Sequence, residues 1–198
     1  MIKRTDIEIM APVGCYESLH AAINAGANSV YFGIGRLNMR SASAANFSEA
    51  DMEKIVEIAH NAGVKTYLTV NTIIYDDELQ VMQQVVNKAK EVGVDAIIAS
   101  DLAVITYAYH VGVEVHISTQ CNISNSEAVK FFSQWADVVV LAREVSLEQI
   151  AEVASSLGLD FETAPTVAEA LAKAHEQLAD EDMLFIGGST FVVAEALE

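Results

Sequence analysis

The stretch IEIMAPVGCYESLHAAINAGANSVYFGIG, residues Ile7–Gly35, decides the fold expected for this chain. It opens with a short apolar run that ends at Pro12, and a second apolar run occupies residues 29–35. Between them, apolar residues recur at the spacing of one helix face: Leu19, Ala22, Ile23 and Ala27. A strand, a helix and a strand at this length predict a βαβ unit, whose two strands lie parallel.

The same local pattern recurs along the chain. Each copy has a helix end, a glycine, a small or apolar residue, a polar residue and then a strand. The copies after AGANSVYF (25–32) are AGVKTYLT (62–69), VGVDAIIA (92–99), VGVEVHIS (111–118) and LGLDFETA (157–164), with WADVVVLA (135–142) lacking the glycine. A repeated supersecondary unit predicts a single architecture for the whole chain.

The totals of the chain restrict its class. At 198 residues, 52% of them hydrophobic, it fits one domain with a large core. No apolar run reaches transmembrane length, so we expect no membrane partner. The start MIKRTDIEIM is too polar and short for a signal peptide, and Cys15 and Cys121 show no metal-ligand spacing. These features predict a cytoplasmic protein with free thiols.

The chain carries a formal net charge of −17, which argues against non-specific nucleic-acid binding because phosphates require clustered lysines and arginines. The charge is unevenly spread. Residues 145–198 contain eleven acidic residues and one lysine, so the composition changes near residues 145–158.

Eight strands alternate with about eight helices in this interpretation. We predict strands at 7–12, 29–34, 65–71, 96–100, 114–119, 137–142, 159–163 and 183–187. Two α/β architectures fit: a (βα)8 TIM-like barrel and an open, doubly wound parallel sheet. The count of eight favours the barrel. So does the alternation in 114–119, which places Glu114, His116 and Ser118 on one polar face, because both faces of a doubly wound sheet are apolar.

In barrels the functional groups gather at the C-terminal ends of the strands. By position, the candidate catalytic residues are Asn71, Asp101, His116, Gln120 and Arg143. The candidate substrate-binding residues are Tyr31, Arg36, Arg40, Ser118 and Glu144.

Each candidate also has a structural interpretation. Asn71 and Asp101 are good helix-capping types, and Arg143–Glu144 can be an ion pair at the rim. His116 lies in mid-strand, where a hydrogen-bonded interior histidine is more common than a base or a metal ligand. Cys121 lies between a strand and a helix, where a thiol pKa is often lowered, although an inert thiol is the more common case. No metal ligands are predicted.

Gly187–Gly188–Ser189 follows the last predicted strand and precedes a predicted helix. Glycines allow close approach of the backbone, and a helix N-terminus offers free N–H groups, so this loop is a candidate anion-binding site. An ordinary strand-to-helix turn has the same composition.

Residues 1 to about 152 resemble the N-terminal barrel part of the U32, or collagenase-like, peptidase family. The matching stretches are EIMAPVGCYESLHAAINAGANSVYFG, LNMRSASAANF, KTYLTVNT, ASDLAVI, EVHISTQCNISN and VVVLAREVSLEQI. The resemblance implies a barrel fold and kinship with enzymes named as peptidases, several of which act in hydroxylating RNA bases or quinone precursors. It carries over no catalytic residues. The cysteines that hold an iron–sulfur cluster in the hydroxylating branch do not occur here, so we expect neither that cluster nor another cofactor.

Residues from about 155 to 198, including FETAPTVAEALAKAHEQLADEDMLFIGGSTFVVAEAL, resemble the C-terminal end of a folylpolyglutamate synthase of the Mur-ligase type. That family's ATP-binding loop is absent. The chain is therefore interpreted as a fusion with a seam near 150–158, in which a single barrel domain spans 1–198.

Three functions follow from these resemblances. The first is an enzyme of the collagenase-like family that takes a small molecule or a peptide at the barrel mouth. The second is a chimeric or truncated barrel scaffold that has lost activity. The third is an anion- or nucleotide-binding remnant of a folate ligase. If strand 183–187 does not close on the first strand, we expect a homodimer, because an open edge pairs readily with another chain.

Overall fold

The computed structural model describes residues 8–38, 47–159, 164 and 166–177. Its first part alternates strands and helices: β1 (Met10–Pro12), α1 (Tyr16–Asn24), β2 (Ser29–Gly33), η2 (Glu49–Asp51), α2 (Met52–Asn61), β3 (Lys65–Val70), η3 (Asp76–Glu78) and α3 (Leu79–Val92). The second part continues with β4 (Ala96–Ala99), α4 (Leu102–Val111), β5 (Glu114–Ile117), η4 (Thr119–Cys121), α5 (Ser126–Phe132), β6 (Val138–Val139), α6 (Leu147–Ser156) and α7 (Val167–Gln177).

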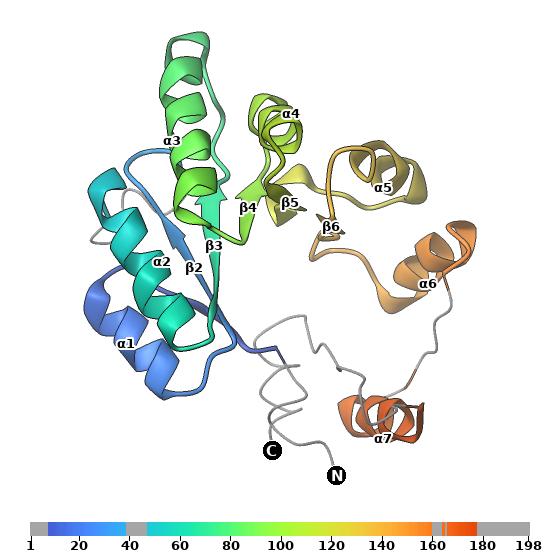
Figure 1. Ribbon diagram of the computed structural model, residues 1–198. Helices are drawn as coiled ribbons and strands as arrows, with labels where there is room; N and C mark the ends of the chain where they lie inside the picture. Colours follow the sequence, from blue (N-terminus) through green and yellow to red (C-terminus); the bar gives the residue numbers. More distant parts are fainter. Residues whose placement is uncertain (1–7, 39–46, 160–163, 165, 178–198) are drawn as a thin grey trace.

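The sheet has six parallel strands in the order β1-β2-β3-β4-β5-β6, so every strand pairs with its neighbours in sequence. A doubly wound sheet reverses its strand order at a switch point, and this sheet does not. The strands curl into half a barrel, and the helices lie along its outer, convex side (Figure 1). The predicted α/β class and parallel sheet are confirmed. The predicted strands at 159–163 and 183–187, on which barrel closure depends, lie outside the described strands and almost wholly outside the described residues.

The main core lies between the convex face of the sheet and the helices. Strand residues that point outward, such as Phe32, Leu68 and Ile97, are almost fully buried against helix residues such as Leu19 and Ile55. The βα repeat places these residues on one face of each strand, and the opposite face lines the concave side of the half-barrel.

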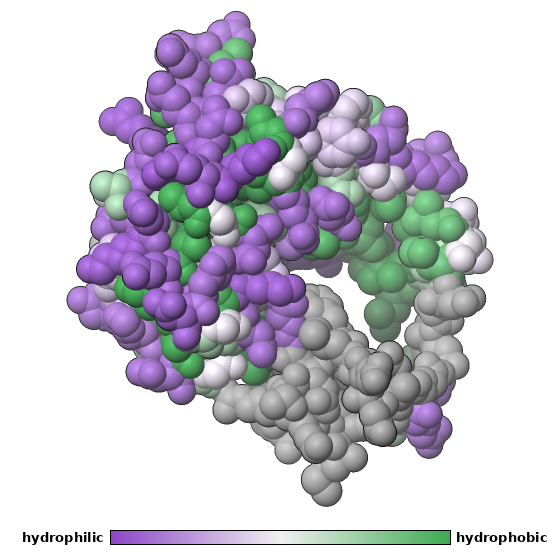
Figure 2. All heavy atoms as spheres, viewed as in Figure 1, coloured by the Kyte–Doolittle hydropathy of each residue, from purple (hydrophilic) through white to green (hydrophobic). Residues whose placement is uncertain are grey.

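The last described strand is shorter than predicted. Instead of 137–142, β6 spans only Val138 and Val139, with an isolated bridge between Ile123 and Leu141. Figure 2 shows hydrophobic atoms gathering over the side of the molecule that carries β6 and α6, whereas the helices α1 to α3 present hydrophilic side chains. The exposed large apolar residues on that side are Val138, Val140, Leu147, Ile150 and Leu159.

Candidate functional site

A pocket opens at the C-terminal ends of β3, β4 and β5. Its volume is about 270 Å³, and it is lined by Asn71, Thr72, Ile73, Ser100, Asp101 and Gln120. Because the ends of neighbouring parallel strands meet at one edge, three of the five predicted catalytic residues come together here: Asn71, Asp101 and Gln120. We call this the rim pocket.

Asp101 holds the walls of the rim pocket together. Its Oδ1 accepts the N–H of Ala103 at 2.8 Å and so caps α4, and its Oδ2 accepts the N–H of Ile74 at 3.1 Å. The capping interpretation of Asp101 is therefore confirmed. Each oxygen accepts one backbone N–H, so this carboxylate positions the loop after β3 against the start of α4.

Ser118 organises the floor of the rim pocket. It is 6% exposed, and its hydroxyl accepts the N–H of Gln120 at 3.3 Å, which caps η4. The Nδ2 of Asn71 donates to the same hydroxyl at 3.5 Å. The amide of Gln120 belongs to an exposed residue and makes no hydrogen bond within the described part of the chain. The pocket thus presents neutral groups that both donate and accept hydrogen bonds.

Cys121 lies beside this floor with its thiol turned inward. Its Sγ donates to the carbonyl of Ser100 at 3.4 Å. Burial raises the pKa of the Cys121 thiol, and the charge of Asp101 raises it further. Of the two interpretations that the sequence offered, a thiol with a lowered pKa and an inert thiol, the structure supports the inert one, because burial and a neighbouring carboxylate both favour the neutral thiol.

His116 lies two residues before Ser118 on the same face of β5, and it does not line the rim pocket. Its side chain is 14% exposed, and its Nε2 lies 2.8 Å from Oε1 of Glu114. The ring also lies 5.0 Å from the ring of Tyr67. The structure therefore supports the interpretation of a hydrogen-bonded interior histidine, oriented by a carboxylate.

Tyr67 continues this polar group across the concave face. Its hydroxyl donates to Oε1 of Glu8 at 2.8 Å. Burial raises the pKa of Tyr67, and the hydrogen bond and charge of Glu8 raise it further, with smaller contributions from Asp95 and Glu114. Glu8, Tyr67 and Glu114 were not among the predicted site residues. The alternation along residues 114–119 could have added Glu114, because it places that side chain on the same face as His116.

The remaining predicted residues are dispersed. Tyr31 faces Tyr67 in register between β2 and β3, on the concave side. Arg36 is exposed after β2, and Arg143 and Glu144 are exposed after β6, with no ion pair between them in the described residues. Arg40, Gly187, Gly188 and Ser189 lie outside the described residues.

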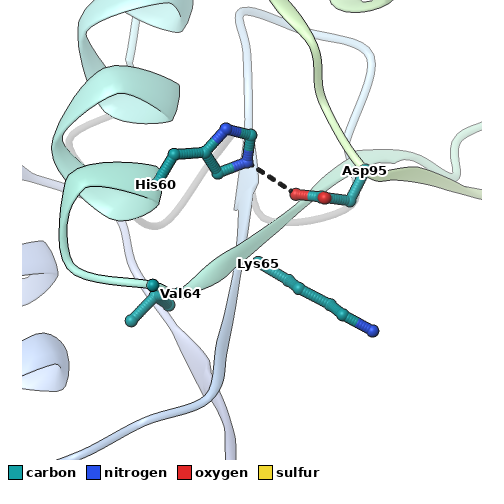
Figure 3. A pocket seen from close by; sticks show the side chains of 5 residues that line it. His60, Val64, Lys65 and Asp95 are labelled. Carbon is teal, nitrogen blue, oxygen red and sulfur yellow. Dashed lines mark hydrogen bonds and ion pairs between the residues drawn. The ribbon is translucent and has the colours of Figure 1, made fainter.

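A second pocket lies at the opposite end of the strands (Figure 3), lined by His60, Gly63, Val64, Lys65 and Asp95. His60 Nε2 contacts Asp95 Oδ2 at 2.8 Å. Burial pushes the pKa of Asp95 upward, but hydrogen bonds from His60 and from Thr66 outweigh it, so the pKa ends below its ordinary value. In barrels this end of the strands serves stability.

Neither pocket holds a metal-binding constellation. Within the part of the chain that the structure describes, no three His, Cys, Asp or Glu side chains are grouped so that they could bind a metal ion. The same residues include no helix that is long and apolar enough to cross a bilayer.

The profile of Peptidase family U32 matches residues 14–179. The chain belongs to this family. The match runs through residues 150–158, so it continues beyond the predicted seam, and the resemblance of the tail to a folylpolyglutamate synthase stays a prediction.

Curated relatives carry two kinds of names. The chain is 57% identical over 155 residues to a collagenase of Porphyromonas gingivalis, covering 78% of this chain and 37% of that protein. It is 37% identical over 145 residues to the 23S rRNA 5-hydroxycytidine synthase of Escherichia coli, covering 73% of this chain and 22% of that one. A tRNA hydroxylation protein of Bacillus subtilis is 33% identical over 159 residues, which cover 79% of this chain and 37% of that protein. The U32 chain thus spans less than two fifths of the length of these relatives.

Solved structures agree on the fold. A U32 peptidase aligns with a TM-score of 0.65 at 12% identity, covering 78% of this chain and 66% of that one. A hydroxymethylglutaryl-CoA lyase of Bacillus subtilis aligns with a TM-score of 0.56 at 12% identity, and the alignment covers 94% of this chain and 74% of the lyase. At these identities the likeness concerns the fold alone.

Proposed function

We propose that this U32 chain is a substrate-recognition half-barrel that binds an extended polypeptide segment at the rim pocket. The observation that carries the proposal is the pairing of two carboxamides, Asn71 and Gln120, at one pocket between β3 and β5. A carboxamide both donates and accepts hydrogen bonds, as does each peptide group of an extended chain. The 57% identity to a collagenase favours a polypeptide as the ligand.

We also propose that this chain binds such a segment without cleaving it. Both oxygens of Asp101 are engaged by backbone N–H groups, and the pKa of Cys121 is raised. A cysteine nucleophile is activated by a lowered pKa, and the pKa of the Cys121 thiol is raised instead. This is the scaffold function inferred from the sequence, now with a binding role.

Fluorescence anisotropy with a labelled gelatin-derived peptide tests both points. We expect saturable binding, weakened about tenfold by Gln120→Ala if one well-made hydrogen bond of about 1.4 kcal/mol is lost. Gln84→Ala, at an exposed position of α3, is the matched control and should bind as the parent does. Equal weakening by both variants, or no binding by the parent, would disprove recognition at the rim pocket, and release of labelled fragments would disprove the second point.

A nucleobase is the alternative ligand, favoured by the names of the relatives that act in RNA hydroxylation. The net charge of −17 argues against an RNA backbone at this chain. Competition with cytidine separates the two: displacement of the peptide by cytidine, but not by ribose, would favour the nucleobase.

Closure of the half-barrel into a full (βα)8 barrel is a further proposal, supported by the sequential strand order. The N–H groups of Ile9 and Val13 donate to Asn28 and Tyr31, on the β2 side of β1. Successive N–H groups of a strand point to opposite sides, so the N–H of Met10 points away from β2, toward the open edge of the sheet. A closing strand would protect the Met10 amide from hydrogen exchange. Rapid exchange at Met10 would contradict closure within one chain, and slow exchange that appears only at high protein concentration would indicate the predicted homodimer.

A cytoplasmic location and the anion site at Gly187–Ser189 stay predictions.

A further inference from the structure

Four side chains form a connected polar group on the concave face of the half-barrel. Glu8 accepts a hydrogen bond from Tyr67 at 2.8 Å, the Tyr67 and His116 rings lie 5.0 Å apart, and His116 lies 2.8 Å from Glu114. They come from β3, β5 and the residues before β1. The interior layers of such barrels are usually filled by branched apolar side chains, so ionisable groups at these positions are unusual.

The group is accessible from one side. In register, Tyr67 of β3 is followed by Ala96 of β4 and Glu114 of β5, so a small side chain stands between the two large ones. The side chain of Glu114 is 52% exposed, which leaves its second oxygen open to a ligand. Lys65 lies on the same face of β3 as Tyr67, two residues nearer the start of the strand. It is the only positively charged side chain of this strand.

An independent observation comes from Ser29 on β2. This residue is 0% exposed, and its hydroxyl has no hydrogen-bond partner in the described residues. Ser29 alternates with Tyr31, so both belong to the concave face, and Tyr31 pairs in register with Tyr67. A buried hydroxyl without a partner is uncommon in folded proteins and points to a polar ligand on this face.

We propose that this concave face binds the guanidinium group of an arginine side chain, using the carboxylates of Glu8 and Glu114 and the ring of Tyr67. A guanidinium is planar and donates two parallel hydrogen bonds to a carboxylate, and it also stacks on aromatic rings. The carboxylates of Glu8 and Glu114, beside Tyr67 and the Tyr31 that faces it in register, match both properties, whereas a neutral side chain would bring no positive charge to offset the two carboxylates. That this arginine belongs to a peptide rests on the proposed function. The side chain of an arginine in a peptide bound at the rim pocket would extend from the C-terminal ends of β3 and β5 toward the starts of these strands.

The site is tested with small molecules, independently of the rim pocket. Isothermal titration of the full chain with N-acetyl-arginine amide should show binding, and N-acetyl-citrulline amide, which has the same shape without the charge, should show none. Glu114→Gln should weaken binding at least tenfold, and Glu91→Gln, an exposed glutamate of α3 with 71% of its side chain accessible, should leave it unchanged. Far-UV circular dichroism and urea midpoints establish that each variant is folded.

Each result has a separate meaning. Equal heats for the arginine and citrulline compounds, or equal effects of Glu114→Gln and Glu91→Gln, would overturn the cation site. If Glu114→Gln unfolds, Glu8→Gln serves as the second variant with the same expectation. A labelled peptide that lacks basic residues and still depends on Gln120 would support the rim pocket whatever the outcome here, so the two proposals fail separately.

Discussion

The carboxylate of Asp95 joins β4 to β3, because its Oδ2 accepts the backbone N–H of Thr66 at 2.7 Å. The hydroxyl of Thr66 donates to the same oxygen at 2.9 Å. The arrangement recurs at a second pair of strands, where Oδ1 of Asn28 accepts the N–H of Ile9 at 2.8 Å. The polar residue that precedes these strands in the repeated pattern is therefore a link between neighbouring strands.

Replacing Asp95 by alanine should destabilise the fold. Thr66 is fully buried, so Asp95→Ala leaves its N–H without this acceptor and its hydroxyl with only the 3.5 Å contact to His60 Nε2, and we expect a loss of about 2–3 kcal/mol in the free energy of unfolding. Asp95→Asn should lose less, because Asn28 shows that an amide oxygen can accept the same bond. Urea denaturation measures both, with Asp77→Ala at an exposed position as control. Equal losses for the alanine and asparagine variants would contradict this role.

The contribution of Asp51 to stability should disappear in acid. Hydrogen bonds from Ser48 at 2.6 Å and Tyr16 at 2.7 Å, with the former the larger cause, lower the pKa of Asp51 to about 2. The folded pKa lies below the unfolded value of about 3.9, so the stabilisation is present above that pH and is lost as the pH falls toward 2.

Asp51→Asn tests this dependence. Its destabilisation, from urea unfolding at pH 6, 4 and 3, should be largest at pH 6 and shrink at pH 3. Glu53→Gln, at an exposed position in the first turn of α2, should show no such trend. If the difference in the free energy of unfolding between the parent and Asp51→Asn instead grows toward pH 3, the ionised Asp51 carboxylate is not the source of this stabilisation.

Gly33 is required by the close approach of Asn38. A Cβ at position 33 would lie 2.7 Å from the Cβ of Asn38 and closer still to its amide. Asn38 is 2% exposed and donates to the carbonyl of Gly35 at 3.2 Å, so it cannot move away freely. We expect Gly33→Ala to cost about 1–3 kcal/mol. In an Asn38→Gly background, which removes the Cβ and the amide of residue 38 together, the same substitution should cost at least about 1 kcal/mol less, and additive losses in thermal or urea unfolding would contradict the contact.

The thiol of Cys121 should react slowly. Burial and the charge of Asp101 raise its pKa, so the thiolate fraction at pH 8 is below that of an ordinary cysteine, whose pKa is about 8.5. Iodoacetamide labelling followed by peptide mass spectrometry over pH 7–10 measures the apparent pKa. Asp101→Asn, which keeps a capping side chain, should shift the profile to lower pH. An unchanged profile would exclude Asp101 as a cause.

Much of the fold follows from patterns in the sequence. The glycine-and-polar-residue repeat predicted parallel strands close to where they lie, and the strand-end rule brought Asn71, Asp101 and Gln120 to one pocket. The roles of these residues did not follow, since only the structure shows that both oxygens of Asp101 are held by backbone donors. Proximity of side chains on alternate strands depends on register, which no local pattern contains, and for that reason Glu8 and Tyr67 were missed.

Strictly sequential strand order has a consequence for how this chain is made. Each strand from β2 onward pairs with the strand synthesised just before it, so every step of sheet growth can begin as the polypeptide leaves the ribosome. A chain end is then never threaded between two strands that have already paired, and the entropy lost in closing each loop stays small. Such a half-barrel can grow by the addition of βα units at its β6 edge, one unit at a time, without disturbing the strands already in place.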